Sequence, residues 1–172
     1  MFIELIATVF AGIACAGIAM LANILTGRRL PKWIMPVAAG LGMLGMTVTN
    51  EYTWFDRTAE RLPDGVTIAM TVDEQSWFRP WTQLWPYTKR FVAVDTGTAR
   101  KNKNLPDQRL ADLYFFGRWS PVNQAPMLFD CAEARSALLI DGATFTDDGT
   151  ATDADWQSMP KGDPILKLVC ET

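Results

Sequence analysis

Residues 1–49 form an almost continuous apolar stretch, whereas the rest of the chain alternates between apolar and polar positions. The run from Leu5 to Leu25 contains no charged residue, and as a helix it would be about 30 Å long, enough to cross a bilayer. A second apolar run, from Trp33 to Thr49, contains Pro36, which lies close enough to a helix start to be tolerated. The pattern predicts a transmembrane helical hairpin over residues 1–49, with spans at about 3–26 and 33–49.

The loop 27–32 between the predicted spans contains three basic residues, Arg28, Arg29 and Lys32. A cleaved signal peptide carries its positive charge before the apolar run, and here the charge follows it, so we expect an uncleaved segment. The positive-inside rule makes the loop cytoplasmic. We therefore predict two spans in a bacterial inner membrane, with both termini in the periplasm.

Both predicted spans have stripes of small residues, which let helix backbones approach closely in lipid. The stripes either pack against each other, which we favour, or dock onto the helices of another subunit. Their members are Ala7, Ala11, Cys15 and Ala19 in the first span and Ala38, Gly42 and Gly45 in the second.

Residues 50–172 have the pattern of a small mostly-β (α+β) extracytoplasmic domain. Short runs rich in β-branched and aromatic residues, bounded by turn formers, predict strands at 66–72, 90–96 and 111–119, with Gly117 as a bulge, and further strands from 127 onward. The tail "DPILKLVC" could form an edge strand or a helix of one to two turns. Cys131 and Cys170 are the only cysteines of this part, and an oxidising compartment favours their pairing in one disulfide.

The C-terminal sequence also has a recognisable order of residues: "DC" at 130–131, Arg135, an apolar strand, "DGATFTDDG", Trp156, "MPKGDP" and Cys170. This order resembles the C-terminal half of the small secreted β-domains called surface-adhesin protein E-like. The resemblance covers residues 130–170 and implies a mostly-β domain in which Cys131 is bonded to Cys170. That family carries no defined activity, so the resemblance implies no function.

Composition argues against several classes of function. Histidine is absent, which removes the commonest general base, the Ser-His and Cys-His nucleophile pairs and most catalytic zinc sites. Residues 50–172 carry 13 Lys and Arg against 18 Asp and Glu, and this net negative charge disfavours binding to nucleic acid. The acidic stretch 147–155 lacks the ligand spacing of a calcium loop. We expect no catalytic residues, no metal, no cofactor and no nucleic-acid partner, and therefore not an enzyme.

Tryptophan is unusually frequent, with seven in the chain, and Trp77, Trp81 and Trp85 recur every four residues. That spacing would place them on one face of a helix, although Pro80 and Pro86 allow only a short or broken one. The three indoles could belong to the core of the domain, lie on the membrane surface, or anchor a partner protein. The predicted interface segment is 76–87, and its candidate residues are Trp77, Phe78, Arg79, Trp81, Trp85 and Tyr87.

These observations favour a non-catalytic accessory or assembly subunit of a bacterial inner-membrane complex. The expected partners are an integral membrane protein complex and phospholipid, and the preferred host, by analogy, is a respiratory or photosynthetic electron-transfer complex. The alternative is a membrane-tethered periplasmic domain that binds a small ligand or surface target through its aromatic segment.

Overall fold

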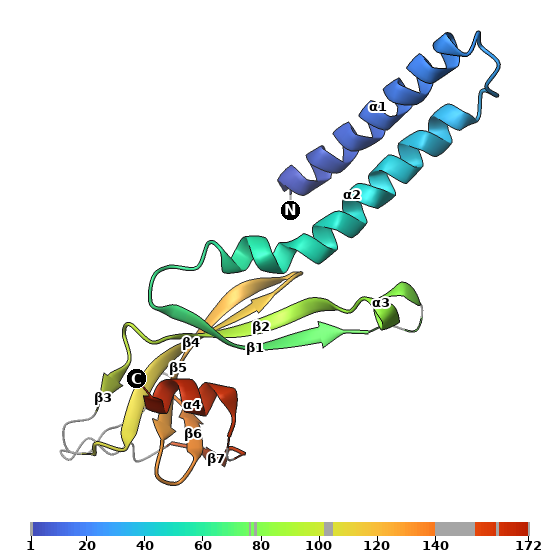
Figure 1. The fold of residues 1–172 in the computed structure, drawn as a ribbon. Helices are drawn as coiled ribbons and strands as arrows, with labels where there is room; N and C mark the ends of the chain where they lie inside the picture. The colour runs from blue at the N-terminus through green and yellow to red at the C-terminus, as the bar shows by residue number, and fades with distance from the viewer. Residues whose placement is uncertain are drawn as a thin grey trace. The chain divides into compact units, whose positions relative to one another are not determined.

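The structure is a computed structural model, and it describes residues 2–75, 77, 79–101, 105–139, 154–160 and 162–171. Contacts divide the chain into two units, Met1–Asp56 and Arg57–Thr172. The first contains helix α1 (Phe2–Leu25) and most of helix α2 (Ile34–Ala59). The second contains the antiparallel sheet and helices α3 (Trp81–Leu84) and α4 (Pro164–Glu171) (Figure 1).

Helix α1 ends in a local hydrogen-bond motif that the sequence specifies. Gly27 has a φ of 70°, in the left-handed region that glycine adopts without steric cost. Its amide donates to the carbonyl of Ile24 at 3.1 Å, and the amide of Arg28 donates to the carbonyl of Asn23 at 2.7 Å, which is a Schellman motif. The chain can therefore reverse within a few residues and begin α2 at Ile34.

The two helices run antiparallel and touch at two glycines (Figure 1). A Cβ added at Gly12 would lie 2.5 Å from a side-chain carbon of Met43, and one added at Gly42 would lie 2.5 Å from the sulfur of Cys15. A Cβ added at Gly45 would meet nothing within 4 Å. Close approach of the backbones thus depends on Gly12 and Gly42, whereas Gly45 faces away.

Among the described residues, α1 is the one helix long and apolar enough to cross a membrane, with a mean hydropathy of 2.3. Its large apolar side chains, including those of Phe2, Phe10 and Ile18, are exposed. Helix α2 does not reach the same criterion because glycine, threonine and then polar residues interrupt its apolar run. The second span and the periplasmic placement of both termini stay predictions.

The second unit is built on one curled antiparallel sheet with the strand order β1-β2-β4-β5-β6-β7, and β3 pairs with β4 (Figure 1). Neighbours along this order are also close in sequence, so most connections are hairpins. The strands are β1 (Val66–Glu74), β2 (Tyr87–Asp95), β3 (Arg100–Lys101), β4 (Gln108–Gly117), β5 (Ser120–Asp130), β6 (Arg135–Leu138) and β7 (Trp156–Ser158).

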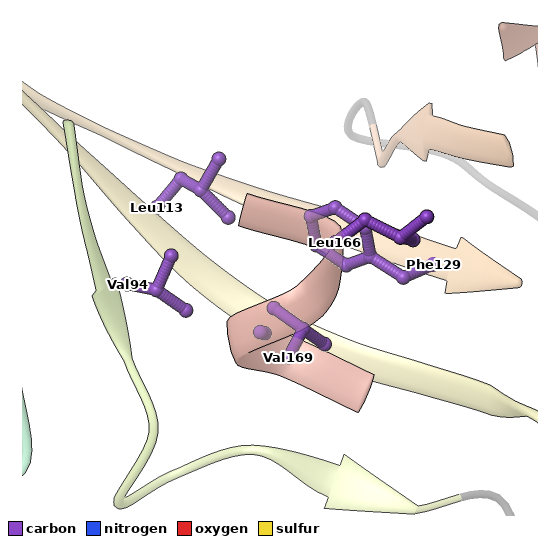
Figure 2. Close-up of a cluster of buried hydrophobic side chains, with 6 residues drawn as sticks. Val94, Leu113, Phe129, Leu166 and Val169 are labelled. Carbon is purple, nitrogen blue, oxygen red and sulfur yellow. The ribbon is translucent and has the colours of Figure 1, made fainter. Parts of the chain in front are cut away.

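Helix α4 lies across one end of one face of this sheet and forms the hydrophobic core with it. Leu166 and Val169 of the helix are buried together with residues of β2, β4 and β5, and Figure 2 shows them converging. The sheet contributes Val94, Ala111, Leu113 and Phe129 to this cluster. Burying each large apolar side chain contributes about 1.5–3 kcal/mol, so this contact is the main stabilising element of the described domain.

Both ends of α4 are fixed. Asp163 is the N-cap, because its carboxylate accepts the amide of Ile165 at 2.9 Å, and Pro164 occupies the first helical position, where a missing N–H costs nothing. At the other end, the guanidinium of Arg109 donates to the carbonyl of Val169 at 3.0 Å. The disulfide between Cys170 and Cys131, with a Cα–Cα distance of 5.9 Å, then joins the last turn to the end of β5.

The mostly-β domain and its single disulfide are confirmed. A bulge was predicted at Gly117; the β4–β5 register does shift between Phe115 and Gly117, but the extra residue lies on β5. The tail, for which strand and helix were both open, is a helix.

Helix α2 continues to Ala59 instead of ending near Thr49, because no proline or glycine occurs before Pro63. A strand was expected to begin at Met127, but β5 begins at Ser120, because Pro121 and Pro126 obscure its first half. The continuation after β6, residues 140–153, lies outside the described residues.

Removing the disulfide should weaken the domain by releasing the end of α4. We expect the double variant C131S/C170S to lose about 2–4 kcal/mol of unfolding free energy. The measurement is thermal unfolding of the full chain in mild detergent, followed by near-ultraviolet circular dichroism. The variant C15S is the control, because Cys15 is a free cysteine of the first unit. Equal midpoints for the double variant and the parent chain would contradict the assignment.

Overpacking at Gly42 should separate the two helices. We expect Gly42→Val to cost about 1–3 kcal/mol, because its Cβ would overlap Cys15, whereas Gly45→Val enters open space and should cost little. The two variants add the same atoms to the same helix, so loss of helical signal on heating compares them directly. A similar loss in both would show that the contact is misplaced.

Candidate functional site: an aromatic and cationic end of the sheet

Strand pairing brings two distant loops to the same end of the sheet. Glu74 pairs with Tyr87 across the β1–β2 hairpin, and Arg90 pairs with Gly117 across β2 and β4. The amide of Arg118 donates to the carbonyl of Lys89 at 3.0 Å. The described residues of the α3 segment, 75, 77 and 79–86, and the β4–β5 turn, 118–119, therefore lie at one end, which we call the aromatic end.

Large apolar side chains are exposed at this end. The fractional exposures are 85% for Trp77, 65% for Trp85 and 62% for Trp119. Leu84, in α3, is exposed at 73%. Indoles this open are not part of the hydrophobic core, so of the three interpretations of the tryptophans, the core does not hold for Trp77 and Trp85. The membrane surface and a partner protein are the two that remain.

The expected helical face is shorter than the tryptophan spacing suggests. Helix α3 is a single turn, Trp81–Leu84, so Trp77 precedes it and Trp85 follows it. Phe78 and the side chain of Trp81 lie outside the described part of the chain. Tyr87, expected at the interface, is only 9% exposed and is buried at the start of β2. The β1–β2 register shifts between Tyr87 and Phe91, so simple strand alternation does not relate the burial of these two residues.

Cationic side chains accompany the exposed indoles. Arg118 lies over the ring of Trp119, with 5.0 Å between the guanidinium carbon and the ring centroid. Arg79 and Arg90 are at the same end, and Lys89 forms an ion pair with Glu74. Asp73 accepts the hydroxyl of Thr88 at 2.8 Å. Three arginines on a chain of net charge −3 give this end a local charge opposite to that of the whole molecule.

The other predicted residues are placed as follows. Arg28, Arg29 and Lys32 are exposed in the turn between α1 and α2. Of the small residues on α1, Ala11 and Cys15 are the ones next to Gly42, while Ala7 and Ala19 are half-buried further along the same face. Ala38 is half-buried on α2. Trp33 is exposed and Trp54 is buried. Of these two, only Trp33 has the exposed side chain expected of a tryptophan at a membrane interface.

The residues of the C-terminal resemblance gather around the β5–β6 turn. The buried carboxylate of Asp130 accepts the amides of Ala132 and Glu133, both at 3.1 Å, and pairs with the guanidinium of Arg135 at 3.0 Å. That guanidinium also stacks on Trp156, 4.5 Å from the ring centroid. These contacts order the turn next to Cys131 and stabilise the fold. The resemblance itself stays a prediction.

Trp119 and Arg118 are members of the aromatic end that the sequence did not assign to an interface. Trp119 is 42 positions from Trp77 in the sequence, and only the β2–β4 register joins their ends of the sheet. The available signal was the "GRW" turn itself, because an indole in a hairpin turn has no neighbouring strand position in which to be buried.

Over the described ranges, no group of three or more His, Cys, Asp or Glu side chains is arranged to hold a metal ion. The expectation that the chain is not an enzyme stays a prediction. What the arrangement offers chemically is binding through apolar area, ring faces and guanidinium donors.

Exposure at the aromatic end predicts how substitutions there affect folding. We expect Trp77→Ala and Trp85→Ala to change the free energy of unfolding by less than about 0.5 kcal/mol, the usual range for surface positions. Tyr87→Ala should cost about 2–5 kcal/mol, because it opens a cavity at a buried position. Chemical denaturation of the three variants measures both. A large loss in the tryptophan variants would return those indoles to the core.

Comparison with protein-family models, curated protein sequences and solved structures finds no significant match to this chain.

Proposed function

We propose that this chain is a membrane-anchored docking subunit that binds a partner protein through the aromatic end of its sheet. The observation that carries the proposal is the exposure of Trp77, Trp85 and Trp119 at one end. Interface hot spots are enriched in tryptophan and arginine, and exposed monomer surfaces seldom concentrate both. The role is that of a non-catalytic accessory or assembly subunit of a bacterial inner-membrane complex.

The anchor in this proposal is the apolar N-terminal segment. Helix α1 has the length and composition of a span. The shared small-residue contact with α2 favours a two-span hairpin with the basic turn 27–32 in the cytoplasm and both termini in the periplasm. The second unit then lies on the periplasmic side, where the Cys131–Cys170 disulfide is chemically favoured. The electron-transfer host stays a prediction by analogy.

The charge of the aromatic end supports an acidic partner surface. Arg79, Arg90 and Arg118 accompany the indoles, whereas the two nearest described carboxylates, those of Asp73 and Glu74, are engaged with Thr88 and Lys89. Complementary charge steers association and fixes orientation, while burial of the indoles supplies most of the affinity. Phospholipid is the competing occupant, since tryptophan and arginine also favour bilayer interfaces.

Affinity purification from gently solubilised membranes tests the proposal. The parent chain should retain one or more stoichiometric partner chains, and the double variant W77A/W85A should lose them while remaining in the membrane fraction. A loss of two hot-spot indoles corresponds to at least a tenfold weaker complex.

The matched control is Leu138→Ala, an exposed apolar position on β6, away from the aromatic end. It should retain the partners. Purification of the parent chain without any stoichiometric partner would overturn the proposal, and so would equal retention by W77A/W85A.

A further inference from the structure

Helix α4 covers only part of the sheet face on which it packs. Its eight residues span about 12 Å, whereas the nine to ten residues of β2 and β4 span about 30 Å. Along β2, Val94 is buried under α4, and Val92 and Arg90 follow on the same face toward the aromatic end. Helix α4 therefore does not reach the far half of this face.

A cavity of about 420 Å³ occupies the uncovered half, a volume within the range of small-molecule sites. Strand register places its side chains in two adjacent rows. One row runs from Val72 through Arg90 to Gly117, and the next contains Val92, Phe115 and Asn123. Ser120 and Pro121 complete the rim on β5.

The shape of the cavity depends on Gly117. A Cβ there would lie 3.2 Å from the Cβ of Ser120 and 3.7 Å from the Cγ of Arg90. A larger side chain would therefore occupy the space in which the stem of Arg90 lies. The β4–β5 register shifts at the same point, between Phe115 and Gly117, and its extra residue lies on β5.

The lining combines apolar surface with a single charge. Val72, Val92 and Phe115 supply aliphatic and aromatic walls. Of the lining residues within the described part of the chain, Arg90 alone is charged, and none is a carboxylate. Among the described residues, the guanidinium of Arg90 has no hydrogen-bond or ion-pair partner, whereas the adjacent Lys89 pairs with Glu74. An apolar wall beside one available guanidinium matches an alkyl chain that ends in an anionic group.

We infer that this cavity binds an amphiphile with a short alkyl chain and one anionic headgroup, with the chain against Val72, Val92 and Phe115 and the headgroup on Arg90. The site does not use the docking indoles and does not depend on a partner protein, although its Arg90 also belongs to the aromatic end. The same chemistry is offered by a free alkyl carboxylate and by the end of an anionic lipid.

Equilibrium dialysis of labelled octanoate against the full chain in nanodiscs of zwitterionic lipid tests the inference, with empty nanodiscs as the blank. We expect saturable binding of one octanoate per chain. Arg90→Gln should weaken it about tenfold through loss of a charge-assisted hydrogen bond, and Phe115→Glu should abolish it by placing a carboxylate in the cavity.

Lys89→Gln is the matched control, because it removes the same charge from the adjacent residue, which pairs with Glu74 and does not line the cavity, and it should bind octanoate normally. Octanol, the neutral counterpart, should bind at least tenfold more weakly than octanoate. Absence of saturable binding would overturn the inference, as would equal binding by Phe115→Glu or of octanol. All variants are first compared with the parent chain for their thermal midpoint.

Two further arms separate related outcomes. Addition of anionic lipid to the nanodiscs displaces octanoate if the lipid is the source of the headgroup and leaves octanoate bound if a free acid is. The variant W77A/W85A should bind octanoate like the parent chain. W77A/W85A thus tests partner docking, whereas Arg90→Gln and Phe115→Glu test ligand binding, so the two proposals can fail separately.

Discussion

The contact between α4 and the sheet is the constraint on which the second unit depends. Val169 and Leu166 bury Phe129, Leu113 and Val94, and the helix can stay in place because it is fixed at both ends. The domain is small, so loss of one helix would remove a large fraction of its core. The short length of α4 also explains the open half of the same face. The element that stabilises the domain therefore determines where its cavity lies.

Function in this account belongs to the end of the sheet that α4 does not reach. Exposed indoles contribute little to the stability of the fold. Their presence at three positions of one end therefore indicates a binding role. Pairing of β2 with both β1 and β4 is what unites the α3 segment with the β4–β5 turn, so a surface made of local loops still has a defined geometry. Rigid strands beneath short loops are a common way to present binding residues.

Much of this architecture could be predicted from sequence because the signals are local. The apolar run, the strands at 66–72 and 90–96 and the single disulfide follow from composition, turn formers and cysteine count. Asp163 and Pro164 carry a helix-start signal that would have decided the tail in favour of a helix. The first half of β5 could not be recognised because two prolines in seven residues lower the apparent strand propensity.

What sequence could not provide is the relation between distant residues. The rotation of α2 about its own axis decides that Gly42 contacts α1 and Gly45 does not. The contact of Gly12 with α2 depends in the same way on how the two helices face each other, so the sequence did not single it out. Trp119 lies at the same end of the sheet as Trp77 and Trp85 only because of the strand register. Residue type alone likewise does not distinguish the exposed Trp77 from the buried Tyr87.

The central claim is that the aromatic end meets a protein. Site-specific photo-crosslinking in intact cells tests it directly, with a photoreactive phenylalanine analogue at position 85 and, for comparison, at position 138 on β6. The account predicts a discrete protein adduct of the chain from position 85 and none from position 138. Adducts to lipid alone from position 85, or the same protein adduct from both positions, would contradict it.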